Sequence, residues 1–222
     1  MSVETIAGRM RVVRERIAAA CARSGRSPSE VTLIAVTKGV AAEAIRKAID
    51  SGITDIGENR VQETADKRPS VADVDVTWHM IGHLQTNKVK AALSLFDIIH
   101  SVDSLRLAEA ISSRALSNVP VFVEVNVSQE PTKTGFALEQ LPDAVRAMRA
   151  LPNLDVRGLM TVAPLFERSE DARPIFRRLR EAAHEAGLGQ LSMGMTSDYE
   201  TAVEEGATHV RIGQAIFGER PA

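Results

Sequence analysis

Apolar side chains recur at helical spacing near the N-terminus of the chain. Ile6, Met10, Val13 and Ile17 lie three or four positions apart, and the residues between them are mostly polar or small. This pattern places the apolar side chains on one face of an amphipathic helix. It stops near Gly25, a residue type that commonly ends a helix. We therefore predict one leading helix before the first strand.

Short apolar runs then alternate with amphipathic stretches along the rest of the chain. The run at 31–36 is rich in β-branched residues, which is typical of a strand buried on both faces. Similar runs predict further strands at 54–56, 76–81, 97–100, 121–127, 156–162, 191–193 and 208–212. The stretches between them predict helices at 43–49, 61–67, 88–95, 105–116, 138–150, 171–186 and 199–205, with a last helical turn at 215–217.

Eight strand–helix units in this order predict a parallel sheet with right-handed crossovers. Eight units close naturally into a (β/α)8 barrel of the TIM type, here with an extra N-terminal helix. An open doubly wound sheet is the alternative, because the runs at 54–56 and 191–193 are weak strands. No shift in composition marks a linker, so we expect a single domain over residues 1–222.

Composition narrows the classes of partner and the compartment. Basic and acidic residues nearly balance, 27 against 29, which disfavours nucleic acid as the main partner. The longest apolar runs fall well short of the roughly 18 residues that span a membrane. Charged residues interrupt the N-terminus too often for a signal peptide. Cys21 is the only cysteine, which excludes an intrachain disulfide. We expect a cytoplasmic protein.

Lys38 follows the first predicted strand, where barrel active sites collect their side chains. Its stem begins in an apolar wall, and desolvation there favours the neutral amine that Schiff-base formation needs. A lysine that extends to solvent at the rim would fit the same position. The residues alone leave these two interpretations even.

The turns after the last two strands suit a phosphate group. Residues 194–197 bring a glycine and two hydroxyls before a helix, and residues 211–214 allow a close backbone approach. Ordinary turn chemistry is the alternative, and Ser197 with Glu200 would make a capping box. His79 and His83 are four apart but flank a strand end and a glycine, so we predict no metal site.

Several longer motifs, taken in order, resemble the pyridoxal phosphate homeostasis protein family. They include AVTKGV around Lys38, GENRVQE at 57–63, WHMIGHLQTNKVK at 78–90 and VNVSQEPTKTGF at 125–136. The match continues with LSMGMTSDYETAVEEGATHVRIGQAIFGER at 191–220 and extends over nearly the whole chain. The resemblance implies a fold like the N-terminal barrel of alanine racemase.

The same resemblance implies that pyridoxal 5′-phosphate is bound covalently to Lys38 as a Schiff base. Asn59 would approach the ring, and Arg211 would face the ring nitrogen and leave it unprotonated. His79 is also expected among the cofactor contacts. The phosphate would be held by Met195, Thr196, Ser197, Gly213 and Gln214.

Two positions depart from the family pattern. Arg60 stands where tyrosine is usual after GEN, which puts that contact in doubt. Thr196 stands where serine is usual, and it keeps the hydroxyl.

The implied function is to hold, buffer or deliver the cofactor without catalysis, with pyridoxal phosphate-dependent apoenzymes as candidate recipients. A closed barrel needs no partner to satisfy its sheet edges, so we expect a monomer. Amino-acid and keto-acid pools would be affected indirectly, through vitamin B6 homeostasis.

A racemase is the main alternative, but it needs an acid–base group on each face of the cofactor. Alanine racemase takes one such tyrosine from a second domain, which we expect to be missing because this chain ends at Ala222. Tyr199, the only tyrosine, is expected in a helix, and His79 or His83 would be the remaining candidate bases. A Schiff-base aldolase using Lys38 without a cofactor is the third hypothesis.

Overall fold

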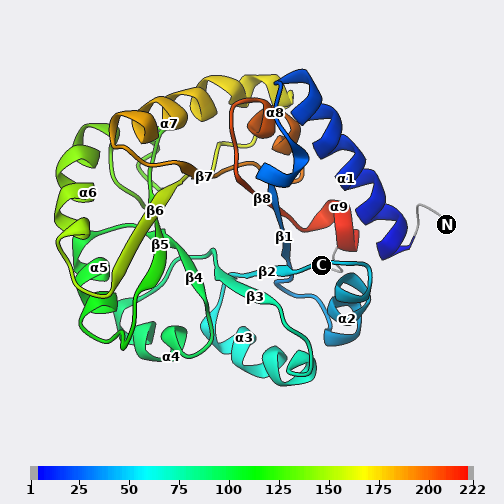
Figure 1. Cartoon of the computed structure of the whole chain (residues 1–222), viewed down its shortest axis with the longest axis horizontal. Coiled ribbons are helices and arrows are strands. Elements are labelled where there is room, and N and C mark those ends of the chain that lie inside the picture. Colours follow the sequence, from blue (N-terminus) through cyan, green and yellow to red (C-terminus); the bar gives the residue numbers. More distant parts are fainter. Residues whose placement is uncertain (1–4, 220–222) are drawn as a thin grey trace.

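The strands form a closed parallel barrel in the order β1 to β8, with β8 paired to β1 (Figure 1). The computed structural model describes residues 5–219. The barrel excludes the open sheet, because β1 is hydrogen-bonded to both β2 and β8. The strands are β1 Thr32–Val36, β2 Asp55–Glu58, β3 Thr77–Met80, β4 Ile98–Val102, β5 Val119–Glu124, β6 Leu154–Met160, β7 Gln190–Ser192 and β8 His209–Ile212.

Helices surround the barrel in an outer ring, as the alternating pattern predicts (Figure 1). The leading helix α1, Ile6–Arg23, packs against α2, α8 and α9 on the outside of the barrel. Its apolar positions are buried, including Met10, Val13 and Ile17. The other helices are α2 Ala42–Asp50, α3 Val61–Lys67, α4 Val89–Leu93, α5 Leu105–Ser112, α6 Leu141–Arg149, α7 Arg173–Glu185, α8 Tyr199–Glu204 and α9 Gln214–Phe217.

The two weakest predicted strands are both present, and both are short. The register of β2 on β1 pairs Ile34 with Asp55, and β7 meets β8 through the single pair Ser192 and His209. Burial of both faces lets such short segments contribute to the sheet without a long apolar run.

Most boundaries differ from the prediction by one to four residues, and two of these differences can be traced to particular contacts. The strand expected at 121–127 ends at Glu124. There the backbone of Glu124 and Asn126 bonds Phe136 in the following loop, while the Val125 amide still donates to Met160 of β6. The helix expected at 105–116 ends at Ser112, whose hydroxyl donates to the Pro152 carbonyl. Leu116, the last residue of the expected helix, is fully exposed, so it does not belong to the buried apolar face that the prediction assumed.

The barrel interior holds an unusually polar layer. The rings of His79, His100 and His209 lie within 5.0–6.3 Å of one another, and Phe122 stacks on His100 at 4.3 Å. Aliphatic side chains usually dominate such interiors, so these imidazoles require partners within the protein. Over residues 5–219, the helices are all too short or too polar to cross a membrane.

Candidate functional site

A cavity of about 710 Å³ opens at the C-terminal ends of the strands. Such rims position side chains from several strands around one space. Val36, Ile81, Val162 and Leu165 give it apolar walls. The predicted residues that line it are Lys38, Asn59, Met195, Thr196, Ser197, Arg211, Gly213 and Gln214.

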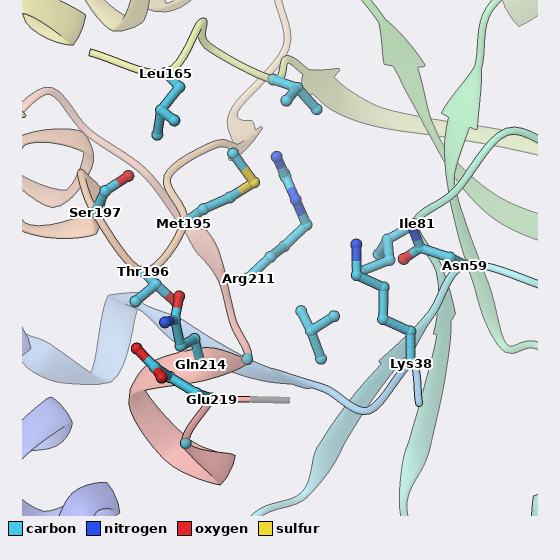
Figure 2. Close-up of a pocket in the computed structure, with 14 residues that line it drawn as sticks. Lys38, Asn59, Ile81, Leu165, Met195, Thr196, Ser197, Arg211, Gln214 and Glu219 are labelled. Atoms are coloured by element: carbon cyan, nitrogen blue, oxygen red, sulfur yellow. The ribbon is translucent and has the colours of Figure 1, made fainter. Parts of the chain in front are cut away.

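The side chains divide between two sides of this cavity (Figure 2). Lys38 and Asn59 come from the β1 and β2 ends, and Thr196, Ser197 and Gln214 lie on the other side. Arg211 stands between the two groups. An amine and a pair of hydroxyls therefore face one space, with a guanidinium between them.

Helix α3 fixes the backbone on both sides of Lys38. The ammonium of Lys67 donates to the carbonyl oxygen of Thr37 at 2.6 Å. The Thr37 hydroxyl donates to Glu58 Oε1 at 2.7 Å. On the other side, the amide of Gly39 donates to Glu63 Oε1 at 2.5 Å. These contacts hold the residues before and after Lys38, which limits the directions its side chain can take.

Glu58 and Lys67 were not predicted as site residues. Glu58 is fully buried, and burial raises its pKa against the opposing hydrogen bonds from Thr37 and Lys67. Its partner Lys67 is nine residues further on, at the end of α3, 2.9 Å from Glu58 Oε1. The sequence signal was a charged residue directly after Ile56 and Gly57, since a carboxylate at the end of a buried strand requires a partner.

The turn before α8 depends on Gly194 and Asp198. Gly194 has φ +90°, and a Cβ there would lie 2.5 Å from Ala202 Cβ. Asp198 Oδ1 accepts a hydrogen bond from the Met195 amide at 2.7 Å. Burial raises the pKa of Asp198, opposed by this backbone hydrogen bond and by the charge of Arg211. Asp198 thus shapes the turn that presents Met195, Thr196 and Ser197.

The capping-box interpretation of Ser197 and Glu200 is wrong. Helix α8 begins at Tyr199, with Asp198 as its N-terminal cap residue. The carboxylate of Glu200 is instead near Arg16 and Arg23 of α1. Ser197 lies outside the helix and lines the cavity. By contrast, Ser104 does cap α5, since its side chain accepts from the Leu107 amide.

Arg211 is held firmly although it is almost entirely buried, at 4% exposure. Its Nη1 donates to Ser192 Oγ at 2.6 Å, and its Nη2 donates to the Thr161 carbonyl at 2.8 Å. Burial lowers the pKa of Arg211 to about 10, opposed by the charges of Asp198 and Glu124. The guanidinium therefore remains charged near neutral pH.

His79 is the predicted cofactor contact that the structure does not bring into this cavity. Its ring is fully buried in the barrel, and both nitrogens are already bonded, one to Asp55 and the other to His100. Side chains of a barrel strand point inward at several depths, and His79 lies one level below the rim residue Ile81.

The other candidate bases also lie away from the cavity lining. His83 is 55% exposed and bonds Asp103, while Tyr199 is buried and its pKa is raised by burial. Arg60 precedes α3 and does not line the cavity. Among the described lining residues, the titratable side chains are those of Lys38, Arg211 and Glu219.

Comparison with known proteins identifies relatives over the full length of the chain. Residues 12–221 match the family model described as alanine racemase, N-terminal domain. A pyridoxal phosphate homeostasis protein from Aquifex aeolicus is 46% identical, over 96% of this chain and 97% of its own. The Pseudomonas aeruginosa protein of the same name is 43% identical, over 98% and 97%.

Solved structures agree with these matches. The structure of PipY from Synechococcus elongatus with pyridoxal phosphate bound has a TM-score of 0.80 and 39% identity, covering 93% of this chain and 100% of PipY. Alanine racemase from Corynebacterium glutamicum has a TM-score of 0.73 at 17% identity, covering 98% of this chain and 61% of its own, which shows a shared fold alone. The chain belongs to the pyridoxal phosphate homeostasis protein family, whose barrel is that of the alanine racemase N-terminal domain.

Proposed function

We propose that this protein binds pyridoxal 5′-phosphate, holds it covalently through Lys38 and takes part in vitamin B6 homeostasis. The observation that carries the proposal is the arrangement of Lys38 opposite Thr196 and Ser197 across one cavity, with Arg211 between them. The relatives that carry this name, and the PipY structure with the cofactor bound, support it.

The chemistry of the lining residues fits this cofactor. Lys38 supplies a primary amine, which in its neutral form condenses with an aldehyde, forming a C=N bond and releasing one water. Thr196 and Ser197 offer hydroxyl donors to a phosphate, beside the backbone at Gly213 and Gln214. Val36 and Ile81 offer apolar contacts to an aromatic ring. When bound, the cofactor would supply an aldehyde carbon on which one amine can replace another.

Arg211 and Asn59 are assigned the contacts to the ring. A guanidinium stays protonated near neutral pH, so at the ring nitrogen it acts as a hydrogen-bond donor and leaves that nitrogen unprotonated. An unprotonated ring withdraws electrons weakly from a bound amine. Such a ring stabilises a carbanion less than a protonated ring would, which is consistent with a binding role.

We infer a role without catalytic turnover. A two-base racemase requires acid–base groups on both faces of the cofactor. The described cavity offers Lys38 for one of them and neither a tyrosine nor a histidine for the other, since Tyr199, His79 and His83 all lie outside its lining. The proposal includes delivery to pyridoxal phosphate-dependent apoenzymes in the cytoplasm. It also includes a monomeric state, since a closed barrel leaves no sheet edge to pair.

Absorbance of the purified protein tests the binding proposal. We expect a visible Schiff-base band after incubation with pyridoxal phosphate, and its loss in Lys38→Ala. Lys88→Ala, on the exposed surface, is the matched control and should keep the band. A protein that stays colourless would contradict the proposal. Exchange of substrate α-protons in deuterated water at enzyme-like rates would overturn the inference that catalysis is absent.

A further inference from the structure

A continuous hydrogen-bonded chain runs through the barrel interior from Arg211 to Asp55. Arg211 Nη1 contacts Ser192 Oγ at 2.6 Å, and Ser192 Oγ contacts His100 Nδ1 at 2.8 Å. His100 Nε2 then contacts His79 Nδ1 at 2.9 Å, and His79 Nε2 contacts Asp55 Oδ1 at 2.8 Å. Five side chains from strands β8, β7, β4, β3 and β2 are thereby joined in sequence.

The two ends of this chain lie in different cavities. Arg211 lines the 710 Å³ cavity at the C-terminal ends of the strands. Asp55 is the first residue of β2 and lines a second cavity of about 580 Å³ at the N-terminal ends, together with Arg14 of α1. The three linking side chains between them are fully buried.

With both histidine rings neutral, the direction of every hydrogen bond in the chain follows from its end at Asp55. Burial acts to raise the pKa of Asp55, but the hydrogen bonds from His79 and Thr54 outweigh it, so the pKa is lowered. The ionised carboxylate can only accept, so His79 carries a proton on Nε2. In a neutral His79 ring, Nδ1 then accepts from His100 Nε2. Burial keeps His100 neutral, so its Nδ1 accepts the Ser192 hydroxyl proton. The oxygen of Ser192 is left to accept from Arg211.

All donors therefore point from the guanidinium towards the carboxylate. Hydrogen bonds aligned in this way polarise one another, so each acceptor is stronger than it would be alone. The buried charge of Arg211 is balanced by Asp198 and Glu124 nearby and, through the chain, by Asp55. Arg211 is thus held in one position, although none of the carboxylates of residues 5–219 forms an ion pair with it.

We propose that Ser192, His100, His79 and Asp55 are positioning residues that fix the Arg211 guanidinium and thereby set the strength of its contact with the cofactor ring. This rests on the proposed function only in naming the cofactor. The hydrogen-bonded order of the chain is a property of the protein itself.

The unliganded protein provides the first test. In nitrogen-detected histidine NMR near neutral pH, we expect the rings of His79 and His100 to be neutral with the proton on Nε2. Asp55→Asn should disturb both rings, since an amide can donate or accept and no longer selects one tautomer. Asp155→Asn, at an exposed carboxylate of β6, should leave them unchanged. A protonated ring or an Nδ1–H form in either histidine would overturn the proposal.

The loaded protein provides the second test. A hydrogen bond from a charged donor is worth enough that Ser192→Ala should weaken pyridoxal phosphate binding by about tenfold or more. It should also shift the pH at which the bound cofactor changes its absorbance. Asp55→Asn should shift that pH in the same direction by less, and Asp155→Asn should not.

The outcomes separate this proposal from the assignment of the cofactor. Failure of the unaltered protein to bind pyridoxal phosphate would reject the proposed function and leave the NMR result standing. Binding by the unaltered protein, with identical absorbance profiles in folded Ser192→Ala and Asp55→Asn, would reject the positioning role. If a variant does not fold, the NMR of the unaltered protein decides.

Discussion

The ammonium of Lys67 lies 2.6 Å from the carbonyl oxygen of Thr37, the residue immediately before Lys38. The same nitrogen is 2.9 Å from Glu58 Oε1 and also bonds Glu63. One cation on α3 therefore joins a buried carboxylate to the backbone that presents Lys38. The geometry of Lys38 depends on this cluster, which we call the Lys67 cluster.

Loss of Lys67 should affect both stability and Schiff-base formation. Lys67→Met leaves Glu58 buried without its cation, and breaking such a pair typically costs about 3 kcal/mol of unfolding free energy. Urea unfolding measures this cost, and stopped-flow absorbance should show slower Schiff-base formation. Lys47→Met removes an exposed i,i+4 pair with Glu43 and should cost less than about 0.5 kcal/mol. Equal effects of the two substitutions would contradict the role of the Lys67 cluster.

The turn before α8 should not tolerate a side chain at Gly194. Gly194→Ala combines a positive φ with a Cβ position 2.5 Å from Ala202, so we expect a loss of at least about 1–2 kcal/mol. Cofactor affinity should fall as well, because Thr196 and Ser197 follow directly. Gly189→Ala meets nothing within 4 Å and is the control. Thermal unfolding with and without cofactor measures both effects, and a fully stable Gly194→Ala protein would contradict this account.

The two hydroxyls opposite Lys38 should recognise phosphate specifically. We expect Thr196→Val or Ser197→Ala to weaken pyridoxal phosphate binding by about tenfold, the effect of losing one hydrogen bond to a charged group. Binding of pyridoxal, which lacks the phosphate, should stay the same. Thr196→Ser keeps the hydroxyl and should bind normally. A parallel loss for both ligands would show that the substitutions disrupt the turn and not a phosphate contact.

The buried histidines should make the protein less stable as the pH falls. Burial lowers the pKa of His209 to about 4, and burial lowers the pKa of His100 well below its ordinary value. In the unfolded chain both titrate near pH ~6.5, so below that value unfolding takes up protons. The free energy of unfolding should then fall by about 1.4 kcal/mol per pH unit for each histidine. The contribution of His209 is complete above about pH 6.5 and is lost as the pH approaches 4.

Substitution of His209 separates its contribution to the pH dependence of stability from that of the carboxylates that titrate in the same pH range. His209→Asn should make the dependence shallower by about 1.4 kcal/mol per pH unit between roughly pH 6 and 5. The raised pKa of Glu124, caused by burial, acts in the opposite direction but is common to both proteins. His184→Asn, on the exposed side of α7, is the control. Urea unfolding at several pH values gives the slopes, and an unchanged slope in His209→Asn would contradict the sign or the size of this effect.

The barrel was predictable because parallel strands buried on both faces leave short apolar runs between amphipathic helices. The run at 31–36 became β1, and the expected helix at 61–67 became α3. Residues that follow the strands gather at one rim of the barrel, so the sequence alone was enough to place Lys38 and Thr196 in one site. The same rule placed Arg211 in the site, but it did not predict the hydrogen bonds of Arg211 to Ser192 and Thr161.

The partners were not predictable because they come from distant positions. His79 meets Asp55 over 24 residues, and His100 meets Ser192 over 92. Nothing in local periodicity reports the depth of an inward side chain in the barrel, which explains why His79 was assigned to the cofactor. Asp198 was not predicted as a site residue, because an aspartate directly before a helix is usually an N-cap. Here its carboxylate accepts from the Met195 amide, outside the helix.

We propose that Lys38 carries the cofactor. The most direct measurement is borohydride reduction of the protein loaded with pyridoxal phosphate, followed by mass spectrometry of its peptides. We predict one reduced phosphopyridoxyl group, located on Lys38 and absent from the Lys38→Ala protein. A label on another lysine, or no label on a protein that binds the cofactor, would contradict the claim.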